Sequence, residues 1–155
     1  MNLATPETRV EDAIGRIQSG FHVFIHGQAA TPKVLIAELV RQAPRLRNVT
    51  LYHLHTEGEV AYAKPELREH FRVRSLFVGA NLRHSVNYDS LDYIPCFLSE
   101  IGALFRSRRI PLDAALIHVS PPDRHGYFSL GTGVDIARAA VESARLVIAQ
   151  VNTRM

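Results

Sequence analysis

The chain has 155 residues, of which 46% are hydrophobic and 21% are charged, and its formal net charge is +3. This length fits one domain that buries roughly 68–70% of the surface its unfolded form exposes. No apolar stretch approaches the roughly 20 residues that cross a bilayer, so we predict no membrane span. The basic residues are scattered instead of forming a block, so the charge does not indicate a nucleic-acid-binding protein. Cys96 is the only cysteine and the first residues lack the layout of a secretory signal, so we expect a cytoplasmic protein.

The first third of the chain predicts a strand, a helix and a second strand. A helix that starts near Thr8 comes first, followed by a short buried strand over residues 21–26. Thr31 as N-cap and Pro32 at the first helical position then indicate a second helix, and residues 49–54 form the next strand. Such a unit has a right-handed crossover and parallel strands, so the chain is of the α/β class.

The rest of the chain continues this alternation. The pattern predicts a short helix over residues 65–71, a strand over 75–79, a loop over 81–92, a helix opened by Pro95, a strand over 113–119, a helix capped by Thr132 and a last strand over 146–151. We therefore expect an open, mainly parallel sheet flanked by helices, in a single domain over residues 1–155. Because domains usually finish with a docked helix or a tail, the final strand leads us to expect the N-terminal part of a longer protein.

The most informative stretch runs from Ser120 to Gly131, directly after a buried strand. It holds Pro121 and Pro122, then polar side chains and Gly126. Open α/β folds bind ligands beyond the carboxyl ends of their strands, so a stiff polar loop at that place predicts a ligand site. Its composition suits a sugar phosphate, an acyl thioester or a peptide equally well.

Polar residues follow four of the predicted strands, at residues 26–28, 55–56, 79–81 and from 120 onward. Because the carboxyl ends of parallel strands lie along one edge, we expect these four segments to share one crevice. Polar residues also follow buried strands for a simpler reason, since loops are solvated.

Other motifs do not identify a catalytic centre. His53 and His55 lie on one face of a strand, but a zinc site needs three or four ligands, so we predict no metal site. The Gly-Thr-Gly at residues 131–133 lacks the rest of the dinucleotide fingerprint and indicates a tight turn. Cys96 stands at the apolar start of a helix, which indicates a buried and inert thiol.

The run over residues 113–131, Asp-Ala-Ala-Leu-Ile-His-Val-Ser-Pro-Pro-Asp-Arg-His-Gly-Tyr-Phe-Ser-Leu-Gly, resembles the hallmark stretch of the acetyl-CoA hydrolase/transferase family. This family includes 4-hydroxybutyrate CoA-transferases. Supporting segments follow in the family's order at residues 24–27, 48–53, 77–79 and 92–95. The resemblance implies the CoA-transferase (NagB/RpiA-like) fold.

The resemblance also implies a reaction. Family members move CoA between a short acyl-CoA and a carboxylic acid, or water, through a glutamyl-CoA thioester. Their glutamate and their glycine-rich CoA loop lie in a C-terminal half that these 155 residues do not contain, so no catalytic residue is assigned here. We expect CoA as a substrate with no permanently bound cofactor, a C-terminal catalytic domain as partner, a homo-oligomer, and a chain that is inactive alone.

Substrate-binding residues are carried over from the family onto the N-terminal wall of the crevice, near the acyl end of the substrate. They are Gly27, Gln28, Ala29, His55, Thr56, Gly79, Asn81, Pro121, Pro122 and His125. The backbone N–H groups of Gln28 and Ala29 are expected to donate to a carboxylate or oxyanion.

Two rival functions stay open. One is a non-catalytic module that binds a small acid or a phosphate on the same scaffold. The other is a sugar-phosphate isomerase, which would need an internal carboxylate base and a basic phosphate loop, and neither is evident in the sequence.

Overall fold

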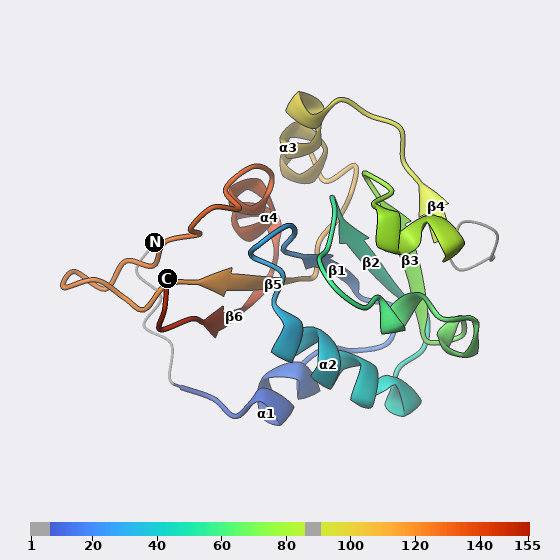
Figure 1. The fold of residues 1–155 in the computed structure, drawn as a ribbon, viewed down its shortest axis with the longest axis horizontal. Coiled ribbons are helices and arrows are strands. Elements are labelled where there is room, and N and C mark those ends of the chain that lie inside the picture. Colours follow the sequence, from blue (N-terminus) through green and yellow to red (C-terminus); the bar gives the residue numbers. More distant parts are fainter. Residues whose placement is uncertain (1–6, 86–90) are drawn as a thin grey trace.

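The fold is built on one six-stranded sheet, seen in a computed structural model that describes residues 7–85 and 91–155 (Figure 1). The strands are β1 (His22–Ile25), β2 (Val49–His53), β3 (Phe71–Ser75), β4 (Leu91–Tyr93), β5 (Ala114–Val119) and β6 (Leu146–Val151). Their order across the sheet is β4-β3-β2-β1-β5-β6, and all the paired neighbours are parallel. The predicted open parallel α/β sheet is confirmed.

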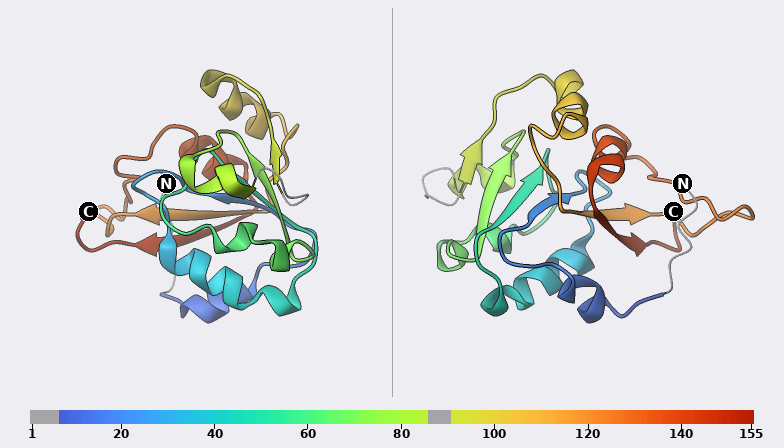
Figure 2. Two further views of the ribbon diagram at one scale, coloured as in Figure 1. Left: turned by 45° about the vertical axis from the view of Figure 1, so that its right-hand side comes forward. Right: turned by 180° about the vertical axis from the view of Figure 1, so that it is seen from behind.

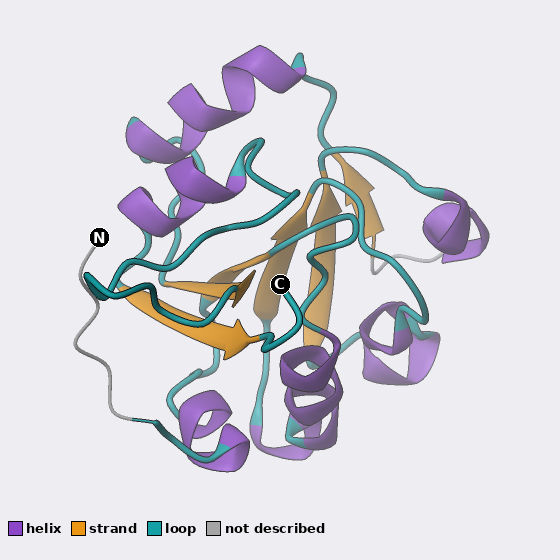
Figure 3. Ribbon diagram, turned by 60° about the vertical axis from the view of Figure 1, so that its left-hand side comes forward, coloured by secondary structure: helices purple, strands orange, loops and turns teal. Residues whose placement is uncertain are grey.

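Helices cover both faces of the sheet (Figures 2 and 3). Their bounds are α1 (Val10–Gly15), α2 (Lys33–Arg41), α3 (Leu98–Arg106) and α4 (Ala137–Ser143). Helices α1 and α2 lie on one face, and α3 and α4 lie on the other. In the described part of the chain, no helix combines the length and the apolar character needed to cross a membrane.

Alternation along the strands supplies two apolar layers. In β1, Val23 and Ile25 join the buried cluster beneath α1 and α2, whereas Phe24 joins the cluster beneath α3 and α4. The ring of Phe24 packs edge to face against Phe105 of α3, with 5.8 Å between centroids. Burial on both faces fixes the strands in register, so their carboxyl ends line one edge of the molecule.

The position predicted for the third strand is wrong. Residues 75–79 were expected to form it because they are an apolar run, but β3 lies at Phe71–Ser75. This strand alternates, with its apolar side chains buried and Arg72 and Arg74 on the open face, where both bind Asp92 of β4. A strand covered on one side needs only a period of two, and the expected continuous run is typical of strands buried on both faces.

Two neighbouring expectations also need correction. The predicted loop over residues 81–92 overlaps a 3-10 helix η4 (Ala80–Ser85) and the strand β4, while its residues 86–90 lie outside the described part. The predicted helix over 65–71 is a single 3-10 turn, Pro65–Leu67.

Three helix starts are displaced from the predicted ones. Pro32 is the N-cap of α2 and not its first residue. The hydroxyl of Thr31, the expected N-cap, instead donates back to the Gln28 carbonyl oxygen. Helix α4 begins well after Thr132. Helix α3 begins after Pro95, and the Glu100 carboxylate accepts a hydrogen bond from the N–H of the capping residue, Phe97.

Candidate functional site

The loops that follow β1 and β2 continue the parallel pairing beyond the strands. Gln28 pairs with Thr56 as an isolated parallel bridge, and the Gln28 N–H donates to the carbonyl oxygen of His55 over 2.6 Å. Gly27 makes this approach possible, because a Cβ there would stand 2.5 Å from the same oxygen. The predicted meeting of these two loops is observed.

The expected donation from the Gln28 N–H to a substrate is wrong, because this N–H is already bonded to the His55 carbonyl oxygen. Gln28 has a positive φ of 53°, and its carbonyl oxygen accepts from both the N–H and the hydroxyl of Thr31. The same hydroxyl accepts from the N–H of Glu57 over 3.0 Å. Within the described residues the N–H of Ala29 makes no hydrogen bond, and Ala29 is exposed, so it is the donor that this turn leaves free.

The loop after β3 contacts the loops after β1 and β2 through Asn81, and these three loops together form the cluster of the candidate site. The side-chain amide donates to the carbonyl oxygens of Thr56 and Gly58, over 2.7 and 3.0 Å. A Cβ on Gly79 would stand 2.8 Å from His55 Nδ1 and 3.1 Å from Asn81 Oδ1, so a glycine is needed for the loops to close. Both of those side-chain atoms are buried and have no hydrogen-bond partner among the described residues.

His55 stands at the outer side of this cluster. Its Nε2 lies 2.8 Å from a carboxylate oxygen of Glu57, and its ring meets that of Phe77 edge to face, with 6.1 Å between centroids. Since a carboxylate only accepts, Nε2 carries a proton. Phe77 is 54% exposed, so an apolar surface lies directly beside the polar cluster.

His26 connects the end of β1 with β5 and with the segment before α4. Its Nδ1 accepts from the N–H of His118 over 3.2 Å, and its Nε2 donates to the Gly133 carbonyl oxygen over 2.5 Å. The ring is fully buried, and this burial lowers the pKa of His26. Gln28 adds a second link between these loops, since its side chain donates to Asp135.

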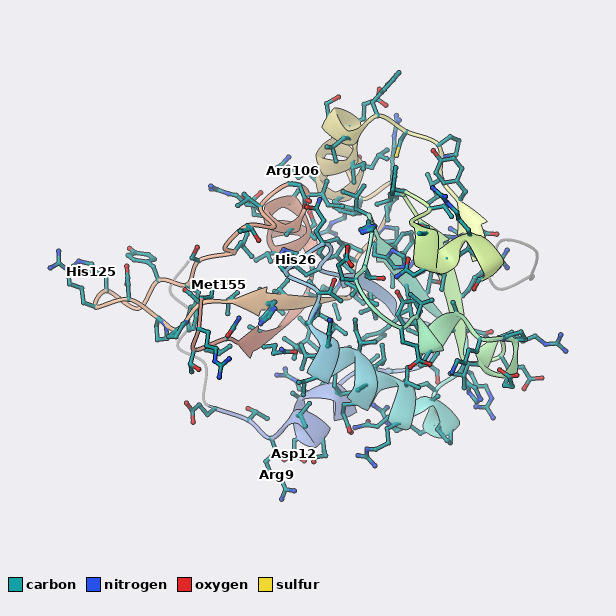
Figure 4. All side chains as sticks on the ribbon, viewed as in Figure 1. Arg9, Asp12, His26, Arg106, His125 and Met155 are labelled. Atoms are coloured by element: carbon teal, nitrogen blue, oxygen red, sulfur yellow. The ribbon has the colours of Figure 1, made fainter. Side chains whose placement is uncertain are left out.

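The remaining predicted residues, Pro121, Pro122 and His125, lie elsewhere. Residues 120–131 form an arm that projects from the end of β5, with His125 near its tip and far from His26 (Figure 4). The arm is stiffened internally, because one carboxylate oxygen of Asp123 accepts from the N–H groups of His125 and Tyr127. The structure thus brings Gly27, Gln28, Ala29, His55, Thr56, Gly79 and Asn81 into one cluster, whereas Pro121, Pro122 and His125 belong to the arm, whose His125 lies apart from that cluster.

Several residues that build the cluster were not expected from the sequence. Thr31 was expected only as a helix cap, and Glu57, Phe77 and Tyr62 were not among the expected site residues. A signal existed only for Glu57, an acid two residues after His55. Among residues 7–85 and 91–155, no three His, Cys, Asp or Glu side chains gather as a metal site would require.

Residues 6–155 match the family described as the acetyl-CoA hydrolase/transferase N-terminal domain. The chain belongs to this family. A succinyl-CoA:acetate/propanoyl-CoA:succinate CoA transferase of Fasciola hepatica is 46% identical over 147 residues, which are 94% of this chain and 30% of that protein. A 4-hydroxybutyrate coenzyme A transferase of Clostridium kluyveri is 39% identical over 145 residues, covering 94% of this chain and 34% of that protein.

Solved structures agree on the fold. The crystal structure of RipA from Yersinia pestis superposes with a TM-score of 0.87 at 31% identity, over 96% of this chain and 37% of that one. A 4-hydroxybutyrate CoA-transferase from Porphyromonas gingivalis gives a TM-score of 0.77 at 29% identity, over 96% of this chain and 33% of that one. The expected CoA-transferase fold is confirmed, and the chain spans about a third of the length of the relatives it matches.

Proposed function

We propose that this chain is one wall of an acyl-CoA hydrolase/CoA-transferase active site, and that further polypeptide supplies the nucleophile. The observation that carries the proposal is the family match over residues 6–155, combined with relatives named as CoA transferases of about three times this length. The clustered loops after β1, β2 and β3 support it, because ligands of open α/β sheets bind at this edge.

The proposed reaction has two covalent stages. A glutamate carboxylate attacks the thioester carbonyl, which forms an acyl-glutamyl anhydride and releases the CoA thiolate. The thiolate attacks the glutamyl carbonyl, which forms a glutamyl-CoA thioester and releases the acyl group as a carboxylate. An acceptor carboxylate then reverses these two steps, which gives the acceptor's CoA thioester and frees the glutamate, or water hydrolyses the glutamyl thioester to free CoA and the glutamate. CoA is thus a substrate, and the glutamate is not among these 155 residues.

The cluster of this chain suits the acyl end of such a substrate. The free N–H of Ala29 can donate to a carboxylate or a developing oxyanion, and the exposed ring of Phe77 can lie against an acyl chain. The arm with Pro121, Pro122 and His125 projects beyond the domain, and we infer that it lies against the polypeptide that carries the glutamate.

Turnover of acetyl-CoA and succinyl-CoA tests the proposal. We expect no measurable transfer to acetate by the purified 155-residue chain. A chimera of this chain with the remaining two-thirds of the Fasciola hepatica relative should turn over at the 1 to 1,000 per second, roughly, that is typical of enzymes. Enzyme-like rates from the chain alone would refute the proposal. Acid binding by a folded chimera without turnover would instead favour a non-catalytic small-acid or phosphate-binding module.

A further inference from the structure

Three buried side chains behind the cluster form a hydrogen-bonded chain. His53 Nε2 lies 3.3 Å from the hydroxyl of Tyr62, and that hydroxyl lies 2.8 Å from the hydroxyl of Thr56. His53 and Tyr62 have no exposed surface, and Thr56 is 2% exposed. The rings of His53 and Tyr62 also meet edge to face, with 5.8 Å between centroids.

This chain fastens the loop of the candidate site to the sheet. His53 is the last residue of β2, and Tyr62 lies in the 3-10 helix η2 (Ala61–Ala63) that follows the loop. Thr56 is held from the other side as well, because its carbonyl oxygen accepts from Asn81 and its backbone pairs with Gln28. The Thr56 hydroxyl therefore occupies one position in the cluster.

The protons of the chain can be counted. Burial lowers the pKa of His53 to about 3 and raises that of Tyr62, so at neutral pH the imidazole is neutral and the phenol keeps its proton. The imidazole, the phenol and the Thr56 hydroxyl then hold one proton each, three in all, for two hydrogen bonds. One proton is left without an acceptor inside the chain.

Burial decides which member carries the spare proton. His53 Nδ1 is buried without any partner among the described residues, and a buried N–H without an acceptor costs more than a lone pair without a donor. The imidazole proton therefore sits on Nε2 and is donated to Tyr62, which donates in turn to Thr56. With both hydrogen bonds in this direction, the Thr56 hydroxyl proton is the spare one. Of the three residues, Thr56 is also the one that has any exposed surface.

We propose that the Thr56 hydroxyl donates a hydrogen bond to an oxygen of a bound carboxylate or acyl group, and that His53 and Tyr62 are positioning residues that set this direction. Thr56 and the free N–H of Ala29 are then two donors on adjoining segments, joined by the Gln28–Thr56 bridge. The identity of the ligand rests on the proposed function. The donor-to-acceptor direction of the hydrogen bonds from His53 through Tyr62 to Thr56 does not.

The tautomer of His53 tests the direction of the chain without any ligand. Long-range proton–nitrogen NMR spectra of the 155-residue chain, recorded between pH 5 and 8, should show a proton on Nε2 and none on Nδ1 throughout. A proton on Nδ1 would overturn the inference, because the Thr56 hydroxyl would then donate inward to Tyr62.

Acetate is the probe for the donor itself. Followed by amide shifts of the labelled chain, acetate should bind the Thr56→Val variant about tenfold more weakly than the unsubstituted chain, and Thr56→Ser should keep the affinity. Tyr62→Phe should weaken acetate binding severalfold. Tyr52→Phe is the matched control and should leave it unchanged, since Tyr52 is equally buried and its hydroxyl bonds to His22 in the other apolar layer.

The outcomes separate the inference from the proposed function. Equal acetate affinity in the unsubstituted chain and in Thr56→Val would overturn the role of Thr56 as donor, whatever the tautomer. Absence of acetate binding to the unsubstituted chain, with the proton on Nε2, would overturn the carboxylate as ligand and count against the proposed function, while the direction of the buried chain would stand.

Discussion

The N–H of Gln28 donates a 2.6 Å hydrogen bond to the carbonyl oxygen of His55, and this contact joins two loops that lie 27 residues apart in the sequence. The bond extends the β1–β2 pairing past the ends of both strands and holds the backbone of the two loops that form the candidate site in one position. Rigid support matters here, because binding groups are effective only when they are held in place before the ligand arrives.

Gly27→Ala should destabilise the fold by about 1–3 kcal/mol, because the new methyl group would stand 2.5 Å from the His55 carbonyl oxygen and neither backbone can yield easily. Urea denaturation followed by circular dichroism measures the loss. Gly15→Ala is the matched control, since no atom outside its chain neighbours and its own helix backbone lies within 4 Å of a Cβ placed there, and it should be neutral or slightly stabilising. Equal stability of the two variants would show that the β1 loop can move away from His55.

The sequence predicted the parts of the fold that local patterns control. Strands β1, β2 and β5 are short apolar runs buried on both faces, and β6 is a similar apolar run that is only partly buried; a pattern detects such runs directly. Strand β3 was misplaced because its arginines reach the open face and bind Asp92, a partner that only the folded sheet reveals.

The location of the candidate site could be predicted from the sequence, but its hydrogen bonds and contacts could not. Polar residues after parallel strands indicated one edge, and seven of the expected residues do meet there. The commitment of the Gln28 N–H could not be foreseen, because it depends on pairing beyond the strand ends. The direction of the arm could not be predicted either, because turn residues indicate where the backbone bends but not the direction that the following segment takes.

Acid should destabilise the protein through its buried histidines. Burial lowers the pKa of His26, His53 and His118, that of His53 to about 3. An unfolded histidine titrates near pH 6.5, so below this pH the unfolded state binds more protons and the free energy of unfolding falls. The full stabilisation is present above pH 6.5, and each histidine removes up to about 1.4 kcal/mol per pH unit until its folded pKa is reached.

Urea midpoints at pH 7, 6, 5 and 4 check this expectation. Because His53 stays neutral furthest into acid, His53→Gln should flatten the decline most clearly between pH 5 and 4. An unchanged slope in this variant would mean that His53 gains no protonation penalty on folding. His125→Gln serves as the comparison, because that side chain is exposed near the tip of the arm and should not alter the slope.

Asp123 should order the arm without stabilising the domain. Its carboxylate accepts from the N–H groups of His125 and Tyr127, but these residues pack outside both apolar clusters. Asp123→Ala should therefore speed amide hydrogen exchange at His125 and Tyr127, while the free energy of unfolding stays within about 0.5 kcal/mol. Asp123→Asn keeps an acceptor oxygen and should retain most of the protection. Loss of global stability in Asp123→Ala would show that the arm contributes to the fold.

Exposed apolar side chains lead us to expect self-association. Phe97 is 76% exposed, and Leu98, Tyr93 and Phe77 are each more than half exposed; all of them lie between the end of β3 and the start of α3. Such side chains favour association because it removes their apolar surface from water. Light scattering from micromolar to millimolar concentration should show a mean mass that rises above one chain, and the double change Phe97→Ser with Leu98→Ser should reduce it. Val134→Ser, an exposed position before α4, is the control and should not. A strictly monomeric chain across this range would contradict the expectation. It would indicate that these apolar side chains contact a bound ligand and not another protein surface.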